Sequence, residues 1–219
     1  MKKSLKPGAV LSPLPAVMVS CQKEGGKPNI ITIAWTGIVN SEPPMTYVSV
    51  RKSRFSHDII KESGEFVINL TTESLAFATD WCGVKSGRDF DKFAEMKLTP
   101  EPSEKVSCPG IAESPVCLEC VVKEIREYPS HDMFVAEIVN VRVDESIMDE
   151  KGRVCFEKAG LLCYNHGEYY SQGSRRLGTF GYSVMKPKTK KRLEKEQAER
   201  RRVNRAKSRA KRREAKKSD

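Results

Sequence analysis

The chain has 219 residues and a formal net charge of +10 at pH 7, but this charge is concentrated at one end. Residues 186–219 contain 17 lysines and arginines and 5 acidic residues, whereas the first 185 residues contain 22 basic and 24 acidic ones. The body is therefore close to neutral, which excludes any inference from net charge about a site within it. No apolar stretch approaches the roughly 20 residues that span a bilayer, and the 7 cysteines lack the spacing of a disulfide-stabilised secreted domain.

The N-terminal residues 1–21 combine lysines, apolar residues and a cysteine in an order that could be mistaken for an export signal. Pro13 and Pro15 interrupt the apolar segment that such a signal needs. We therefore expect a cytoplasmic protein whose cysteines are reduced thiols.

Four short β-branched segments, each bounded by Gly, Pro, Asn or Ser, predict strands in the first third of the chain. They cover residues 16–21, 29–36, 46–51 and 65–70. A short helix is expected between the third and the fourth strand, with Ser56 as its N-cap and Gly64 just after its last turn.

Two further helices and two long strands are predicted next. The helices lie within residues 73–83 and 89–96, and the first of them ends at Gly83. The strands lie within residues 114–128 and 133–147, and their alternating pattern indicates an antiparallel pair. Because strands dominate, the sequence predicts a mainly β fold, a barrel with a few helices on its outside.

Cys117 and Cys120 form a C-x-x-C motif within the first long strand. Side chains three residues apart on a strand point to opposite faces of the sheet, so one metal ion could not easily reach both. We expect buried structural thiols here and no metal site.

Cations and hydroxyl groups gather where the third strand meets the short helix. Ser49 and Arg51 share one face of the strand, and Lys52, Ser53 and Ser56 follow at the start of the helix. A helix N-terminus offers unpaired N–H groups and a partial positive charge, which suit a phosphate. For any one strand, the alternative is that its polar side chains face solvent and bind nothing.

Three stretches together resemble one known family. These are "NIITIAWTGIVNSEPPMTYVSVRKSRFSHDIIKESGEFVINL", "CGVKSGRDFDKFAEMKLTP" and "YYSQGSRRLGTFGYS". They are similar to the flavin reductase-like, FMN-binding split-barrel family, and most closely to its flavoredoxin branch. The resemblance covers roughly residues 10–185 and implies a domain of residues 1–185, followed by the basic tail 186–219. It implies a six-stranded antiparallel barrel that forms a homodimer and binds FMN, or less often FAD.

The resemblance also implies which residues contact the flavin. The contacts along the isoalloxazine ring would come from Asn29, Thr32, Ala34, Trp35 and Thr36. Those beneath the ribityl chain would come from Ser49, Val50 and Arg51. The phosphate would be held by Lys52, Ser53 and Ser56, in agreement with the anion argument, and His166 would line the site.

No catalytic residue is expected, because hydride transfer between nicotinamide and flavin is carried by the cofactors themselves. His57 and His166 are interpreted as lining or structural residues. Arg88 and Lys92 lie in a stretch that the resemblance places near the flavin edge or the dimer contact. The alternative is that both side chains are solvated charges at a helix end.

The function therefore has two readings at the level of sequence. The first is an electron-transferring flavoprotein, either an NAD(P)H-dependent flavin reductase or a flavoredoxin-type carrier. No G-x-G-x-x-G motif is present, so NAD(P)H would stack transiently on the flavin. The second is a nucleic-acid-associated protein that uses the basic tail, with the barrel as scaffold. The tail itself is predicted to be helix-prone or disordered. Its expected role is either electrostatic binding to nucleic acid, particularly RNA, or to an acidic partner, or that of a solvated tail that aids solubility.

Overall fold

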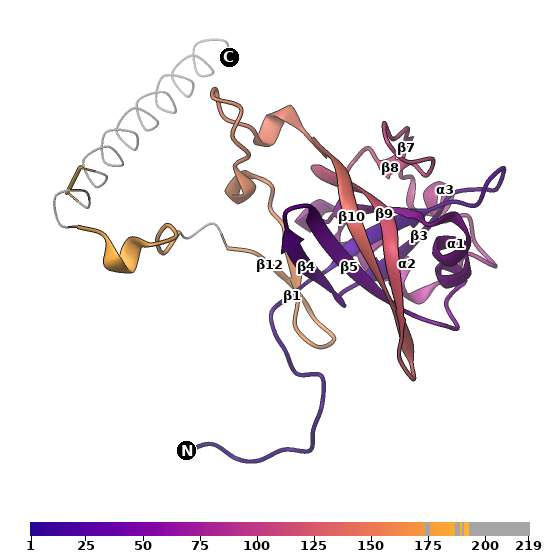
Figure 1. The fold of residues 1–219 in the computed structure, drawn as a ribbon, viewed down its shortest axis with the longest axis horizontal. Helices are drawn as coiled ribbons and strands as arrows, with labels where there is room; N and C mark the ends of the chain where they lie inside the picture. The colour runs from indigo at the N-terminus through magenta and orange to yellow at the C-terminus, as the bar shows by residue number, and fades with distance from the viewer. Residues whose placement is uncertain (174–175, 187–188, 190, 193–219) are drawn as a thin grey trace, which may run out of the picture. The chain divides into compact units, whose positions relative to one another are not determined.

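The computed structural model describes residues 1–173, 176–186, 189, 191 and 192 (Figure 1). Met1–Ser174 form one compact unit. The expected basic tail 186–219 lies outside the described residues, apart from Lys186, Thr189, Lys191 and Arg192. In the described part of the chain, no helix is both long and apolar enough to cross a membrane.

A seven-stranded antiparallel sheet is the centre of the fold, with the strand order β3-β2-β6-β9-β10-β5-β4. Its strands are β2 (Val17–Cys21), β3 (Asn29–Ile33), β4 (Thr36–Ser41), β5 (Pro44–Arg51), β6 (Glu65–Leu70), β9 (Val116–Glu127) and β10 (His131–Val143). Two small sheets accompany it. One consists of β1 (Leu14–Pro15), β11 (Leu162–Tyr164) and β12 (Tyr169–Ser171), and the other of β7 (Pro100–Glu101) and β8 (Gly110–Ile111).

The sheet closes on itself at a link of two residues. β3 and β4 occupy opposite edges of the strand order, yet only Ala34 and Trp35 separate them in the chain. The backbone N–H of Ser49 on β5 donates to the Trp35 carbonyl at 2.9 Å, which ties the link to the opposite edge. When β3 and β4 are counted as one bent strand, the barrel has the six strands that were expected. The predicted single strand 29–36 is thus broken at the closure.

Residues 1–173 contain three α-helices: α1 (Phe55–Ser63), which packs on the interior core of the barrel, and α2 (Ala76–Val84) and α3 (Lys92–Met96), which pack on the other face of β2 and β3. The first unit also contains the 3-10 turns η1 (Glu73–Leu75), η2 (Glu145–Ile147) and η3 (Phe156–Lys158), and a further one, η4 (Tyr182–Val184), belongs to the residues that follow this unit. All three predicted helices are present, and the mainly β prediction is confirmed. α2 continues one residue beyond the predicted end at Gly83.

The predicted N-cap of α1 is wrong. Arg54 holds that position, and Ser56 lies inside the first turn, where its hydroxyl accepts a hydrogen bond from Asn29 Nδ2 at 2.7 Å. A long-range partner therefore replaces the local capping bond. Gly64 ends the helix in the left-handed conformation with φ of 69°, as predicted, because glycine adopts this conformation without strain.

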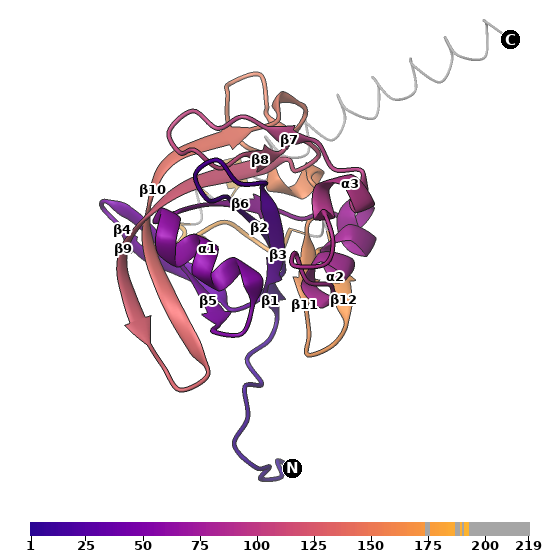
Figure 2. The ribbon, with the colours of Figure 1, turned by 90° about the vertical axis from the view of Figure 1, so that its right-hand side faces the viewer.

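Strands β2 and β3 separate two apolar cores. Their alternate residues, such as Val19 and Ile31, face the barrel interior together with Ile59 and Ile60 of α1. Met18 faces the other side and packs with α2 and α3. Figure 2 accordingly shows α1 on one side of β3 and α2 and α3 on the other.

The two cysteines of the C-x-x-C motif belong to different cores. Cys120 lies in the barrel interior, and Cys117 lies in a small separate cluster beneath the loop that contains Cys108. The prediction that they face opposite sides of the sheet is confirmed. Among the described residues, no group of three or more His, Cys, Asp or Glu side chains is placed to hold a metal ion.

Candidate functional site

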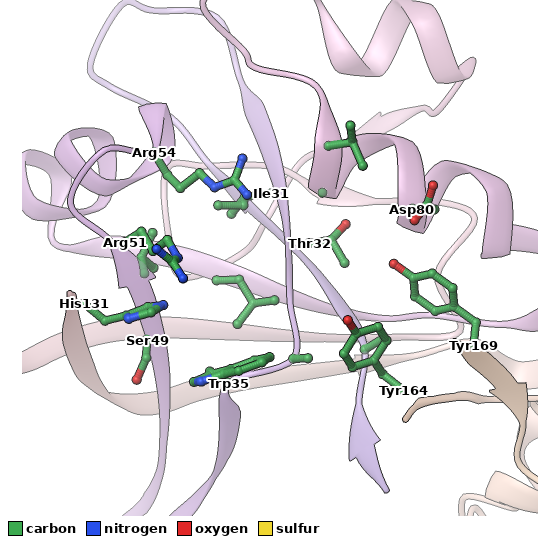
Figure 3. Close-up of a pocket in the computed structure, with 16 residues that line it drawn as sticks. Ile31, Thr32, Trp35, Ser49, Arg51, Arg54, Asp80, His131, Tyr164 and Tyr169 are labelled. Carbon is green, nitrogen blue, oxygen red and sulfur yellow. The ribbon is translucent and has the colours of Figure 1, made fainter. Parts of the chain in front are cut away.

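A cavity of about 330 Å³ opens at the closure of the barrel; we call it the ring cavity (Figure 3). Several of its lining residues were predicted to be flavin contacts: Thr32, Ala34, Trp35, Ser49, Val50 and Arg51. They come from the end of β3, the link and the end of β5. The closure of the sheet therefore brings together two predicted groups that are separated in the chain.

Other walls of the ring cavity come from distant segments. Arg54 and His131 lie on the same side as Arg51, whereas Asp80, Tyr164 and Tyr169 lie on the opposite side (Figure 3). The two tyrosine rings belong to the β11–β12 hairpin and lie 5.4 Å apart between their centres. The cavity thus has a cationic side and a side with aromatic rings and a carboxylate.

The pKa values of two groups in this cavity are shifted. Burial raises the pKa of Tyr169 to about 12, and the charge of Asp80 and a hydrogen bond with this carboxylate act in the same direction. The phenol is protonated at neutral pH. Burial and the nearby Arg51 lower the pKa of His131 below its ordinary value. A neutral imidazole is consistent with the lining of a planar, uncharged ring.

A second cavity of about 460 Å³ lies at the start of α1; we call it the anion cavity. The predicted residues Asn29, Arg51, Ser53 and Ser56 line it. Among its described lining residues there is no carboxylate, and there are five cations, namely Arg51, Arg54, Lys85, Arg88 and Lys92. Such a surface is suited to an anion.

The backbone at the start of α1 adds to this preference. Within the described residues no side chain caps the helix, and Phe55 and Ser56 of its first turn line the cavity. The positive end of the helix dipole therefore lies at this wall of the cavity. Arg88 Nη1 donates to the Ser53 carbonyl at 3.2 Å, and its guanidinium lies 5.5 Å from the centre of the Phe55 ring. These contacts hold the loop after α2 against the helix start.

Lys92 is a buried cation in the anion cavity, with only 3% of its surface exposed. Its Nζ donates to the Cys82 carbonyl at 2.7 Å. Burial lowers the pKa of Lys92 from 10.5 to about 8, so that the ammonium is charged at neutral pH at a cost in free energy. The interpretation of Lys92 as a solvated helix-end charge is therefore wrong. Arg88 is exposed, but it lines the anion cavity and contacts Ser53 and Phe55.

The two cavities are neighbours, because Ile31, Arg51, Arg54 and Gly83 line both of them; we call the pair of cavities the groove. At Gly83, a Cβ atom would lie only 3.1 Å from the Cβ of Thr32, so glycine lets α2 pack closely on β3 beside the groove. The groove joins an aromatic compartment to a cationic one.

Comparisons with known proteins identify the family and the fold. Residues 11–173 match the family model described as the flavin reductase like domain. The chain belongs to this family. The structure superposes on flavoredoxin of Desulfovibrio vulgaris with a TM-score of 0.79, at 33% identity over 84% of this chain and 100% of that one. Flavoredoxin from Methanosarcina acetivorans gives 0.75, at 28% identity over 84% and 100%. A protein of Archaeoglobus fulgidus is 37% identical over 57% of this chain and 71% of its own length.

Family membership confirms the resemblance seen in the sequence and the split-barrel fold. Three residues that the resemblance suggested are nevertheless placed elsewhere in this member of the family. Thr36 Oγ1 donates to the Tyr47 carbonyl at 2.6 Å, and His166 Nε2 lies 3.1 Å from the Leu11 carbonyl. Lys52 Nζ lies 3.2 Å from Oδ1 of the buried Asp132. Of these described residues, none lines the ring cavity or the anion cavity.

His57 has a structural role. Its Nε2 lies 2.8 Å from Asp132 and its Nδ1 2.8 Å from Asp58, and the ring packs edge-on against Phe134. These contacts fix the first turn of α1 to β10, next to His131.

Sequence reasoning did not find several lining residues, namely Arg54, Asp80, His131, Tyr164 and Tyr169. Arg54, Tyr169 and the loop with Arg88 lie within the stretches that carry the family resemblance, so their presence in the site could have been inferred. Asp80 and His131 gave no local signal, because only the folded barrel brings their strand and helix ends to the cavity.

Proposed function

We propose that the protein binds FMN along the groove, with the isoalloxazine ring in the ring cavity and the phosphate in the anion cavity. A bound flavin accepts and donates electrons, and the protein supplies binding, orientation and electrostatics. In this family member we infer a flavin reductase that uses NAD(P)H or a flavoredoxin-type electron carrier.

The observation that carries this proposal is the change in chemistry from one of these neighbouring cavities to the other. Trp35 and Tyr164 offer aromatic surfaces for a flat ring, and the backbone of the link lies beside them. Five cations and an uncapped helix start lie at the other end, without a carboxylate among the described lining residues. FMN has the same two parts, an aromatic ring system and a dianionic phosphate, and thus fits the residues present.

The roles of the chain's own residues follow from their positions. Arg51 and Arg54 line both cavities and would lie beside the chain that joins ring and phosphate. Ser53, Arg88 and Lys92 would hold the phosphate through charge-assisted hydrogen bonds. Tyr164 and Tyr169 would lie on the side of the ring opposite Arg51 and would limit the access of water to a bound flavin there.

The test is the absorption spectrum of the purified protein, followed by titration of the apoprotein with FMN and with riboflavin. We expect a yellow protein, and Ser53→Ala should weaken FMN about tenfold or more through loss of a charge-assisted bond. Riboflavin lacks the phosphate, so its weaker binding should hardly change. Ser146→Ala, an exposed serine outside the groove, is the matched control. Equal losses for both flavins would show that Ser53 shapes the fold or the ring cavity.

A colourless protein that takes up no FMN would overturn the proposal. If such a protein bound RNA with a steep dependence on salt, the alternative of a nucleic-acid-associated protein would be favoured. For a flavin-loaded protein, mixing with NADH or NADPH under anaerobic conditions separates the two flavoprotein roles. Rapid bleaching of the flavin indicates a reductase, and bleaching only by a reduced partner protein indicates a carrier.

A further inference from the structure

Residues 52–57 lead from the end of β5 into the first turn of α1; we call them the cavity turn. The middle of the cavity turn lines the anion cavity with Ser53, Arg54, Phe55 and Ser56. The residues at its two ends, Lys52 and His57, contact a single buried carboxylate on β10, that of Asp132. One side chain of a neighbouring strand therefore holds the cavity turn at both ends.

Asp132 lies between two side chains that can carry positive charge. Its side chain is 1% exposed, Lys52 Nζ lies 3.2 Å from Oδ1, and His57 Nε2 lies 2.8 Å from Oδ2. The other ring nitrogen of His57 lies 2.8 Å from Asp58. When both carboxylates are ionised, only the imidazolium donates from both nitrogens at once. Because a buried carboxylate needs such partners, its loss or the loss of a partner would loosen the cavity turn.

The start of β10 contributes to both ends of the groove. His131 pairs with Arg51 of β5, and Asp132 pairs with Val50. Successive side chains on a strand point to opposite faces, so His131 lines the ring cavity while Asp132 reaches the cavity turn. The cavity turn is thus anchored to the strand that also forms a wall of the ring cavity.

Other long-range contacts of the cavity turn come from residues of the anion cavity itself. Asn29 Nδ2 donates to Ser56 Oγ at 2.7 Å, and Arg88 Nη1 donates to the Ser53 carbonyl at 3.2 Å. Both donors line the anion cavity, so an anion that enters can compete for them. The described lining of the anion cavity does not include Asp132, so its contacts need not be exchanged for contacts with an anion.

We propose that Asp132 is a positioning residue for the phosphate of the flavin. Through Lys52 and His57 it holds the cavity turn in the conformation that binds an anion, without touching the ligand. This proposal rests on the proposed function and assigns part of the preference for a phosphate-bearing flavin to a residue of another strand. A turn that is ordered before binding loses less conformational entropy when the phosphate binds.

The test compares FMN with riboflavin, which has the ring and no phosphate. The apoproteins of Asp132→Asn, of His57→Asn and of the double variant are titrated with each flavin, and phosphorus NMR reports on the phosphate of bound FMN. Asparagine at position 57 has no atom in the place of Nε2, so the link to β10 is lost. Asp58→Asn is the matched control, because Asp58 is exposed and contacts the same imidazole from within α1. Urea unfolding verifies that each variant is folded.

We expect Asp132→Asn and His57→Asn each to weaken FMN about tenfold or more and to leave riboflavin within about twofold. The phosphorus resonance of bound FMN should shift in both variants, because the surroundings of the phosphate change. The double variant should lose no more affinity than the weaker-binding single variant, since both changes break the same link. Asp58→Asn should bind both flavins within about twofold of the wild type.

The proposal is overturned if both flavins lose affinity equally, if neither does, or if the losses add in the double variant. His57→Asn decides the matter alone if Asp132→Asn does not fold. A wild-type protein that binds no FMN would instead refute the proposed function. A wild-type protein that prefers FMN, with variants that keep this preference, would refute only the role of Asp132.

Discussion

Replacement of Lys92 by methionine should make the apoprotein more stable and flavin binding weaker. The pKa of Lys92 is lowered from 10.5 to about 8, which corresponds to a cost of about 3 kcal/mol for the charged form at neutral pH. Methionine has a similar length and no charge, but it loses the hydrogen bond to the Cys82 carbonyl, worth about 1 kcal/mol. The net gain at pH 7 is therefore expected to be about 2 kcal/mol.

The pH dependence of this effect has a defined sign. The unfolded chain keeps the Lys92 proton up to pH 10.5, whereas the folded chain releases it from about pH 8. The wild-type apoprotein thus gains stability from this group as the pH rises through that interval, and the variant lacks the gain. The advantage of Lys92→Met should therefore disappear above pH 10.5.

Urea unfolding of the apoproteins at pH 7 and at pH 10 measures these differences. In parallel, flavin titration at pH 7 should show FMN weakened about tenfold or more in Lys92→Met, with riboflavin little changed. Lys61→Met, at a half-exposed lysine of α1, should alter neither stability nor flavin binding appreciably. A Lys92→Met protein that is less stable than wild type at pH 7, with the same pH slope, would refute the reasoning.

Three further predictions follow from the fold. Lys52→Ala should lower the free energy of unfolding by about 1 kcal/mol, because it removes the cation beside the buried Asp132. It should reduce the affinity for FMN less than Arg54→Ala does. A larger loss of FMN affinity than in Arg54→Ala would contradict the placement of Lys52 outside both cavities. Deletion of residues 186–219 should leave folding and flavin content intact, as measured by circular dichroism and absorbance, since the family match ends at residue 173. The protein should sediment as a homodimer, because Ile38 and Val39 expose apolar side chains on the edge strand β4; a flavin-loaded monomer would count against it.

Local sequence patterns were sufficient to predict most of the fold. A short β-branched segment bounded by turn residues located β6 at Glu65–Leu70 to the residue. Gly64 marked the end of α1, because the helix ends in a left-handed conformation that suits glycine. The break between β3 and β4 could not be predicted in this way. It is imposed by the pairing of β4 with β5 at the far edge of the sheet, a contact that no local pattern encodes.

The site was predictable where one segment supplies several contacts and not where distant segments meet. Ser53 and Ser56 were found because a helix start has a recognisable composition. Lys92 was ambiguous, because a lysine at the start of a short helix usually lies in solvent. In the fold α3 packs against β3, and Lys92 donates to the Cys82 carbonyl of α2. His131 and Asp80 reach the ring cavity from a strand start and a helix face that carry no local mark of function.

The link of two residues between β3 and β4 limits where this scaffold can change its chain length. Loops usually tolerate insertions, since the entropy of closing them grows slowly with length. Ala34 and Trp35, however, join opposite edges of the sheet and also line the ring cavity. An extra residue in this link would therefore both move the two edges apart and displace this wall of the ring cavity. The turn of the β11–β12 hairpin, between Tyr164 and Tyr169, is free of this constraint. Divergence of ligand preference among members with this architecture is therefore expected to accumulate in that hairpin, while the link keeps its length.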